Sequence, residues 1–385
     1  MNKRWLVNRT NQEFLEYLSG KTSISTVLAQ ILVNRGIKDE NAIRDFLSPS
    51  LDKLHDPFLL PDMQKAVDRI KTASDKGETI LVHGDYDADG ITATALMVSV
   101  LRTLGLKTSY HIPNRISDGY GLNKRGIEIA RSLGAGLIIT VDCGITSEEE
   151  VSLANSSGID TIITDHHEPP KQLPVAVAVI NPNRADSDYP FRHLAGVGVA
   201  FKLAQALLPE NALDDLLALS AIGTIADSVD LTGENRVLVT HGLKKMNAGM
   251  SKPWISSLKE TAGIADKDLL SGTLSYTIVP RINAAGRLGE ANEVVELFLT
   301  QNRAKADEIA LFLDEQNRKR QQIEGDVYRS ALEMIDPDNP DSAIVLHSSE
   351  WHQGVLGIVA SRIVEMFYRP AFLFSVKGDK AKGSA

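Results

Sequence analysis

Short apolar runs alternate with longer amphipathic segments through the middle of the chain. The apolar runs resemble strands, and helix-like stretches such as ITATALMVSVLRTLG lie between several of them. The runs cover residues 79–85, 107–113, 137–142, 160–167 and 175–181. Apolar strands of about 4–8 residues that alternate with helices of about 10–15 residues are typical of a parallel sheet covered by helices. The pattern therefore predicts an α/β domain.

The pattern changes toward both ends of the chain. Residues 1–75 combine short amphipathic runs with a Pro-rich passage, and we expect a helical and irregular segment packed on the core. Residues 76–300 form the predicted α/β domain. Residues 301–336 have helical periodicity, mixed charge and no proline, which predicts one long connecting helix. A second, smaller α/β pattern starts within residues 337–385, and we expect this second domain to be truncated, because the sequence stops at KGDKAKGSA.

Composition restricts the class of protein further. The 385 residues contain one cysteine, Cys143, so no intramolecular disulfide can form. There is no run of roughly 18 apolar residues and no N-terminal apolar signal segment, so we expect a cytoplasmic protein with no membrane partner. The net charge of −9 argues mildly against a nucleic-acid partner. Carboxylates that bind metal contribute to such a charge, however, and a basic groove can lie on an acidic protein.

The stretch HGDYDADG at residues 83–90 concentrates acidic groups. Asp85, Asp87 and Asp89 stand at alternate positions before Gly90, as in the first half of an EF-hand loop. The twelfth position of such a loop would be Leu96, which cannot supply the bidentate carboxylate, and a strand-like run precedes the loop where an EF-hand has a helix. These aspartates are therefore either solvated turn residues or ligands of a different metal site.

Further acids and imidazoles follow other strand-like runs. Asp142 ends one run, the sequence Asp165, His166 and His167 ends another, and Asp227 follows an apolar helix. Each could be a helix cap or a surface residue by itself. The carboxyl ends of parallel strands meet at one edge of a sheet, however, where ligands of such folds collect. Carboxylates with imidazole and no thiolate suit Mn²⁺ or Mg²⁺ better than a structural zinc, and Cys143 is better explained as a small core residue.

Four stretches resemble, in this order, the successive motifs of the DHH phosphoesterase superfamily: HGDYDADG, VDCG, TDHHEP and GTIAD. The chain is most similar to the RecJ family of single-strand-specific exonucleases, which YHIPNRISDGYGL, LAGVGVAFKLAQAL, LTGENR, PRINAAGRLG, WHQGVLGIVASRI and KGSA also resemble. The similarity runs from about residue 50 to the end, and Asp230 stands where the family has proline. It implies 5′→3′ hydrolysis of single-stranded DNA to 5′-mononucleotides in recombination and repair. It also implies a RecQ-type helicase and a single-strand-binding protein as partners.

The resemblance also assigns roles to residues of the four motifs. It implies two divalent cations, Mn²⁺ or Mg²⁺, held by His83, Asp85, Asp87, Asp89, Asp142, His166 and Asp227. Asp142 would bridge the two ions, while Asp85 would be either a ligand or a group that orients one. His167 would face the scissile phosphate, and Asp165 would orient the histidines.

Candidate substrate contacts lie on glycine-bearing loops and at the edge of the second domain. The resemblance places Arg115, Arg281, Arg287, His352 and Ser384 along the DNA path. Planar guanidinium groups suit the capture of phosphate, although the same arginines could be ordinary solvated loop residues. Trp351 could stack on a base or belong to the core. KGSA resembles the start of the stretch that holds the 5′-phosphate, and the arginine expected after it lies beyond Ala385.

Two other functions remain open from the sequence. A small-substrate DHH hydrolase, such as a nanoRNase, a cyclic-dinucleotide phosphodiesterase or a pyrophosphatase, would use the same metal motifs. The WHQGVLGIVASRI and PRINAAGRLG stretches and the long connecting helix argue against it. A non-catalytic replication scaffold would be expected to lack metal ligands, and here the whole candidate set is present.

Overall fold

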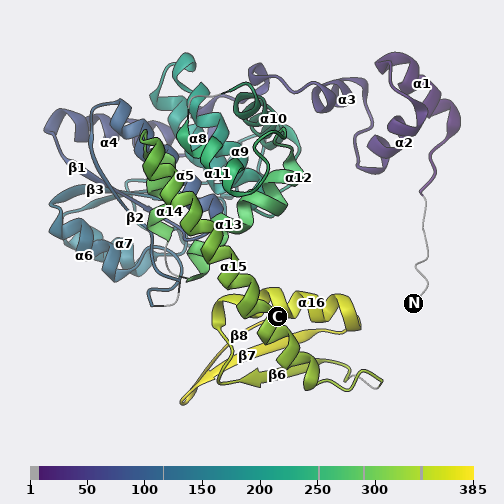
Figure 1. The fold of residues 1–385 in the computed structure, drawn as a ribbon. Coiled ribbons are helices and arrows are strands. Elements are labelled where there is room, and N and C mark those ends of the chain that lie inside the picture. The colour runs from purple at the N-terminus through teal and green to yellow at the C-terminus, as the bar shows by residue number, and fades with distance from the viewer. Residues whose placement is uncertain (1–7, 116, 250–251, 289–290, 339–340) are drawn as a thin grey trace.

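The computed structural model describes residues 8–115, 117–249, 252–288, 291–338 and 341–385, and its largest unit is built on a parallel sheet (Figure 1). The sheet has five strands in the order β2-β1-β3-β4-β5, and all neighbours are parallel. The strands are β1 (Thr79–Gly84), β2 (Lys107–His111), β3 (Ala135–Val141), β4 (Asp160–Thr164) and β5 (Ala178–Ile180). The chain leaves β1 toward β2 on one side and returns to β3 on the other. The predicted parallel sheet is confirmed, and its strand order reverses between β1 and β3.

Helices cover both faces of this sheet, because successive side chains of each buried strand point to opposite faces. Ile80 and Val82 of β1 belong to the larger core, whereas Leu81 belongs to a second core on the other face. The larger core takes in α4 (Met63–Lys76), α5 (Ala88–Thr103), α8 (Gly196–Leu207), α9 (Leu217–Ala226), α13 (Val279–Leu288) and α14 (Ala291–Leu299). The second core is covered by α6 (Lys124–Ser132) and α7 (Glu148–Ser156). The helices α10 (Gly233–Asn247), α11 (Pro253–Thr261) and α12 (Ser271–Thr273) complete this unit.

The N-terminal helices form a small unit of their own to one side (Figure 1). They are α1 (Gln12–Thr22), α2 (Thr26–Asn34) and α3 (Glu40–Leu47), and they share a separate apolar core. The chain continues through two 3₁₀ turns, η1 (Leu51–Lys53) and η2 (Pro57–Leu59), into α4. Arg236 of α10 stacks over the ring of Phe46 at 3.6 Å and also donates to the Phe46 carbonyl oxygen. The unit is therefore attached to the main body at α10.

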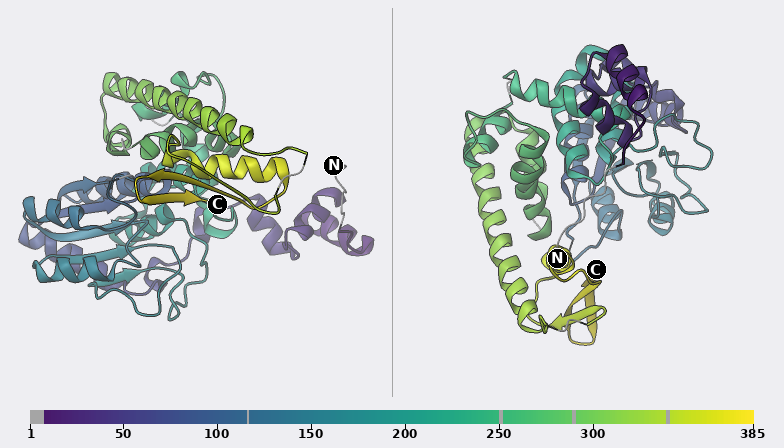
Figure 2. Two further views of the ribbon diagram at one scale, coloured as in Figure 1. Left: turned by 90° about the horizontal axis from the view of Figure 1, so that it is seen from below. Right: turned by 90° about the vertical axis from the view of Figure 1, so that its right-hand side faces the viewer.

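A long helix leads from the parallel sheet to a second, smaller sheet, as predicted (Figure 2). The helix is α15 (Arg303–Glu333), and the sheet contains β6 (Ile344–Ser348), β7 (Ala371–Lys377) and β8 (Lys380–Ser384). β6 and β7 are parallel, and β8 is antiparallel to β7. The helix α16 (Leu356–Phe367) packs on this sheet together with the end of α15. Trp351 is buried in their shared core, so it is a core residue and not an exposed stacking surface.

No helix among the described residues is long and apolar enough to cross a bilayer.

Candidate metal centre

The three aspartates after β1 lie where the chain turns from the strand into α5. Asp87 is the N-cap of α5, and its Oδ1 accepts hydrogen bonds from the backbone N–H groups of Asp89 (3.0 Å) and Gly90 (3.1 Å). A Cβ atom at Gly90 would lie 2.6 Å from the backbone of Asp85, so only glycine allows this tight turn. The DYDADG segment is thus a strand-to-helix turn, and not a calcium loop between two helices.

Asp142 follows β3 at the neighbouring position of the sheet edge. It is buried, and its backbone has a φ of 60°, in the left-handed region that non-glycine residues adopt rarely. A Cβ atom at Gly196 would lie 2.2 Å from Asp142 Oδ1, so the start of α8 can approach this carboxylate only because residue 196 is glycine. Cys143, the next residue, is fully buried in the core, as predicted.

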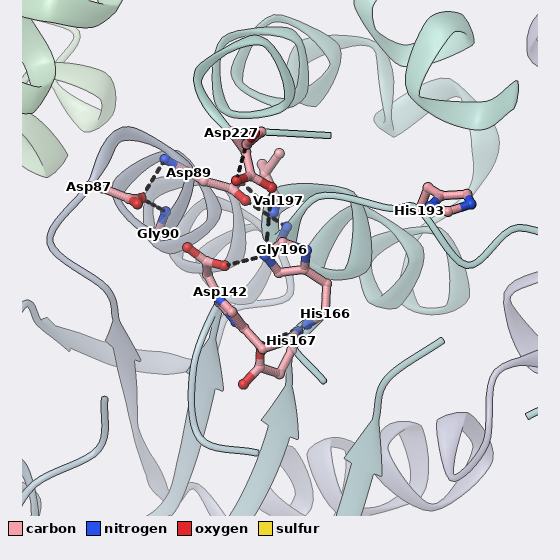
Figure 3. A network of polar contacts seen from close by, with 12 residues as sticks. Asp87, Asp89, Gly90, Asp142, His166, His167, His193, Gly196, Val197 and Asp227 are labelled. Carbon is pink, nitrogen blue, oxygen red and sulfur yellow. Dashed lines mark hydrogen bonds and ion pairs between the residues drawn. The ribbon is translucent and has the colours of Figure 1, made fainter. Parts of the chain in front are cut away.

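The other acids and imidazoles surround these two turns (Figure 3). His166 Nε2 lies 3.2 Å from Asp142 Oδ1 and 3.7 Å from Asp227 Oδ2. Asp227 is the C-cap of α9. The carboxylate of Asp89 accepts from the backbone N–H groups of Gly196 (2.7 Å) and Val197 (2.8 Å) at the start of α8. Side chains that follow β1, β3, β4 and α9 thus converge on one point.

Three overlapping groups of side chains are arranged closely enough to hold cations. In each group, one ligand atom from every residue lies within 4.8 Å of the others. The groups are Asp85, Asp87 and Asp142; Asp89, His166 and Asp227; and Asp142, His166 and His167. Asp142 belongs to the first and third groups and also lies 3.2 Å from His166 of the second, so its carboxylate is close to both candidate ion positions. The structure also places Asp85 with the candidate ligands, a point that the sequence left open.

The carboxylates in this cluster are in an unfavourable environment when no cation is present. Burial and the charge of Asp87 raise the pKa of Asp85 to about 7. Burial and neighbouring carboxylates also raise the pKa values of Asp89 and Asp142 well above the ordinary range. Asp85 Oδ1, Asp142 Oδ1 and Asp227 Oδ2 are buried without a hydrogen-bond partner, and no described lysine or arginine forms an ion pair with any of these acids. Oxygen-rich sites of this kind fit Mn²⁺ or Mg²⁺.

The two adjacent histidines have opposite electrostatic environments. Burial lowers the pKa of His166, which favours the neutral imidazole that a metal ligand must be. A hydrogen bond from Nδ1 to Asp165 Oδ1 (2.7 Å) raises the pKa of His167, which favours the cation. Asp165 is itself fixed, because its Oδ2 accepts from the Ile145 N–H at 2.9 Å. The structure therefore distinguishes a buried, ligand-like His166 from an exposed His167 whose pKa is raised.

His83, which is also a predicted ligand, belongs to none of the three groups. Its Nε2 lies 3.1 Å from the Gly121 carbonyl oxygen, and a Cβ atom at Gly126 would lie 2.7 Å from its ring. Burial and the nearby His111 lower its pKa to about 4, so the ring is neutral. The physical reason is strand alternation: His83 lies on the same face as Leu81, under α6, whereas the carboxylates follow the end of the strand. We therefore leave His83 out of the proposed ligand set.

Tyr120 lies at this site but was not identified from the sequence. Its hydroxyl group is 3.2 Å from the Asp142 carbonyl oxygen and 3.2 Å from His167 Nδ1. Its ring also contacts the rings of His167 and Tyr86 edge to face, at 5.7 Å and 6.4 Å. The only signal in the sequence is an aromatic residue between two glycines of a polar loop. Contacts from a loop of this kind cannot be read from periodicity.

A small pocket lies between the main sheet unit and the second sheet. Its volume is about 100 Å³, and Arg115, Arg287, Gly354, Lys382 and Ser384 are among the residues that line it. Arg287 Nη1 donates to the Gly354 carbonyl oxygen at 2.9 Å, which joins α13 to the turn before α16. Burial and the charge of Arg115 lower the pKa of Arg287. Such a concentration of cations favours an anionic ligand, and it lies within a chain of net negative charge.

Two other predicted substrate residues have protein partners instead. The Arg281 guanidinium forms an ion pair with Asp314 of α15 (2.8 Å) and donates to the Thr277 carbonyl oxygen (2.5 Å). The His352 Nδ1 accepts from the Gly354 N–H at 3.1 Å and so caps the turn before α16. Neither side chain lines the pocket. Arg281 connects α13 to α15, and His352 shapes the backbone of the pocket wall.

Comparison with known proteins gives the family. Residues 79–224 match the DHH family, N-terminal domain. The chain is 40% identical over 385 residues to the single-stranded-DNA-specific exonuclease RecJ of Bacillus subtilis, with 99% of this chain and 49% of that protein covered. A crystal structure of exonuclease RecJ bound to manganese is similar with a TM-score of 0.75 at 39% sequence identity, and 84% of this chain and 81% of that chain are covered.

The chain belongs to the RecJ family. RecJ of Thermus thermophilus in complex with Mn²⁺ has the same fold, with a TM-score of 0.82 at 34% sequence identity over 95% of this chain and 53% of that chain. The predicted family and α/β fold class are thus confirmed. The chain spans about half the length of the Bacillus subtilis RecJ that it matches.

Proposed function

We propose that this RecJ family chain hydrolyses single-stranded DNA from the 5′ end and releases 5′-mononucleotides, with two Mn²⁺ or Mg²⁺ ions as cofactors. The observation that carries the proposal is the set of buried carboxylates with raised pKa values and no cationic partner among the described residues. Support comes from the relatives, which are named single-stranded-DNA-specific exonucleases, and from RecJ structures that contain manganese or magnesium. This function places the chain in DNA recombination and repair.

The proposed ligands would hold two ions, and Asp142 would be available to both. Asp85 and Asp87 would hold one ion, and Asp89, His166 and Asp227 would hold the other. When bound, two divalent ions lower the pKa of a shared water and neutralise charge on the phosphate oxygens. At least one ligand is already fixed by the protein, since both oxygens of Asp89 accept backbone hydrogen bonds from the start of α8. Fixed ligands need little reorganisation when substrate arrives.

His167 is the proposed group that acts on the phosphate. Asp165 holds its Nδ1, so its Nε2–H is available to donate to a phosphate oxygen on which negative charge develops. Tyr120 contacts the same imidazole and limits its rotation. The partly exposed position of His167 suits this role, because the substrate must reach it from solvent.

The small pocket between the sheets is the proposed site for the 5′-terminal phosphate. Arg115, Arg287 and Lys382 supply positive charge, and Ser384 supplies a hydroxyl group. Its volume of about 100 Å³ is enough for a single phosphate group. Arginine can hold a phosphate through two parallel hydrogen bonds, which would fix the register of the strand. Arg281 and His352 are not included as direct contacts.

The remaining parts of the proposal concern organisation and partners. We propose that residues 1–75, 76–300, 301–336 and 337–385 are the N-terminal segment, the catalytic domain, the connecting helix and the start of a second domain. The partners that the RecJ resemblance implies are a RecQ-type helicase, which would expose single strands, and a single-strand-binding protein. The chain would act in the cytoplasm.

The test uses single-stranded DNA labelled at either the 5′ or the 3′ end, with Mn²⁺ and with an EDTA control. Early release of labelled mononucleotide from the 5′ end alone is expected. Asp142→Ala should abolish release, and Asp188→Ala, a change at an exposed aspartate outside the site, should not. Turnover of a dinucleotide without turnover of long strands would instead support a small-substrate hydrolase. Normal hydrolysis by Asp142→Ala would contradict the two-metal site.

A further inference from the structure

An apolar groove with an acidic rim lies away from the metal centre. It has a volume of about 820 Å³, within the range of ligand-binding clefts. Its floor contains Phe201 of α8, Leu217 of α9 and the nearby Leu213, which are almost fully buried. Phe58 of η2 stands at the edge with 47% of its surface exposed. Exposed large apolar side chains that border a cleft are typical of an interaction site.

The groove is a fixed part of the fold. Its outer wall is the segment of η1 and η2, and a buried ion pair holds this segment against the helices. Lys202 Nζ lies 3.0 Å from Glu234 Oε1 and donates to the His55 carbonyl oxygen at 2.5 Å. Glu234 Oε1 in turn accepts from the His55 N–H at 3.0 Å. The side chains of Lys202 and Glu234 are almost fully buried, so the wall cannot move away without breaking a desolvated ion pair.

The negative charge at the rim of the groove favours a ligand that carries positive charge. Asp52 and Glu210 are exposed at the mouth, and neither forms an ion pair with a described residue. Asp214 also lines the groove but already pairs with Lys245. Carboxylates at the rim repel nucleic acid and attract lysine or arginine. The chain itself has a net charge of −9, which disfavours a second copy of the chain as the occupant.

We propose that this groove docks a short segment of a partner protein that carries two or three large apolar side chains flanked by lysine or arginine. The apolar side chains enter the cleft beside Phe201 and Leu217, and the cationic side chains reach Asp52 and Glu210. This is the groove mode of peptide recognition, in which buried anchors provide affinity and charges provide selectivity.

The groove and the metal centre use different residues of the helices α8 and α9. The start of α8 holds Asp89, whereas its end contributes Leu208 to the groove. No residue that lines the groove belongs to the candidate ligand groups, so the two sites do not overlap. Docking is therefore independent of DNA hydrolysis, and substitutions at the rim leave the catalytic machinery unchanged.

The experiment selects random peptides of about twelve residues, displayed on phage, against the whole chain at low salt. Selected peptides are expected to be rich in leucine or phenylalanine and in lysine or arginine. Synthetic copies should bind Asp52→Lys/Glu210→Lys at least about tenfold more weakly than the unchanged chain, and Phe58→Glu should weaken them similarly. Asp266→Lys/Asp268→Lys, which changes the net charge equally at exposed positions outside the groove, should bind normally.

Three results would overturn the proposal. The first is that no selected peptide binds above background, and the second is that peptides bind the rim variant and the control variant equally well. The third is self-association in sedimentation that Phe58→Glu abolishes, since a second copy of the chain would then be the occupant. Loss of DNA hydrolysis in any of these variants is measured separately, so failure of the exonuclease proposal cannot be mistaken for failure of this one.

Discussion

Replacing Asp85 by asparagine should stabilise the metal-free chain while it removes activity. Burial and the charge of Asp87 raise the pKa of Asp85 from 3.8 to about 7 in the folded state. The folded state therefore binds this proton more tightly than the unfolded state does, and stability falls as the pH rises through this range. The penalty is absent below pH 3.8 and complete above pH 7. One pH unit corresponds to about 1.36 kcal/mol, so the penalty is about 4 kcal/mol at pH 8 and about 2 kcal/mol at pH 5.

Asparagine has nearly the same shape and carries no charge, so the penalty disappears in Asp85→Asn. Urea denaturation after EDTA treatment should give a free energy of unfolding for Asp85→Asn that exceeds the unchanged chain by about 4 kcal/mol at pH 8, with a smaller excess at pH 5. Asp188→Asn, at an exposed position, is the matched control and should show little difference at either pH. With added Mn²⁺ the unchanged chain should become more stable than Asp85→Asn, because only the unchanged chain keeps the full ligand set.

The reasoning would be refuted by a metal-free Asp85→Asn chain that is less stable than the unchanged chain at pH 8. An excess that does not change with pH would also refute it, since the gain would then come from packing and not from the removal of a charge. Either result would mean that the cluster tolerates its carboxylates without a cation.

Three further predictions concern the site. Gly196→Ala should reduce Mn²⁺ affinity and hydrolysis at least about tenfold, because its Cβ would lie 2.2 Å from Asp142 Oδ1; titration of the metal against activity tests this. Tyr120→Phe removes the hydroxyl contact with His167 and should lower kcat about tenfold with little change in KM, and an unchanged kcat would exclude this positioning role. Arg287→Ala should raise KM for 5′-phosphorylated strands more than for strands with a 5′-hydroxyl; equal effects on both would argue against the phosphate pocket.

The sequence predicts the sheet and most of the metal cluster for one physical reason. Buried parallel strands are short apolar runs, and their carboxyl ends meet at one edge. Asp85 and Asp142 follow two such runs, and the structure places both runs side by side at the point where the strand order reverses. The long helix is predicted equally well, because its 31 residues contain no proline and only one glycine, Gly325, so nothing in the segment ends the helix early.

Contacts that depend on packing could not be predicted in this way. His83 belongs to the first motif, yet its position in the strand points it toward α6 and away from the carboxylates. The sequence predicts Arg281 on a glycine-bearing loop, but it lies in α13 and pairs with Asp314, 33 residues away in the chain. Tyr120 reaches the site only through the course of a glycine-containing loop. In each case the deciding neighbour is distant in sequence, and periodicity carries no information about it.

The backbone provides part of the positive charge that the acidic cluster needs, but not all of it. The N-terminus of α5 lies at Asp87, and the N-terminus of α8 donates two N–H groups to Asp89, so two helix dipoles favour these carboxylates. The dipole of α9 acts in the opposite direction. Asp227 lies at the C-terminal, negative end of this helix, where a carboxylate is disfavoured. These dipoles do not offset the burial and mutual repulsion of the carboxylates, because the pKa values of Asp85 and Asp142 remain raised. The same residues therefore lower the stability of the metal-free fold and create the affinity for divalent cations. A substitution that removes one of these charges stabilises the metal-free fold and weakens cation binding.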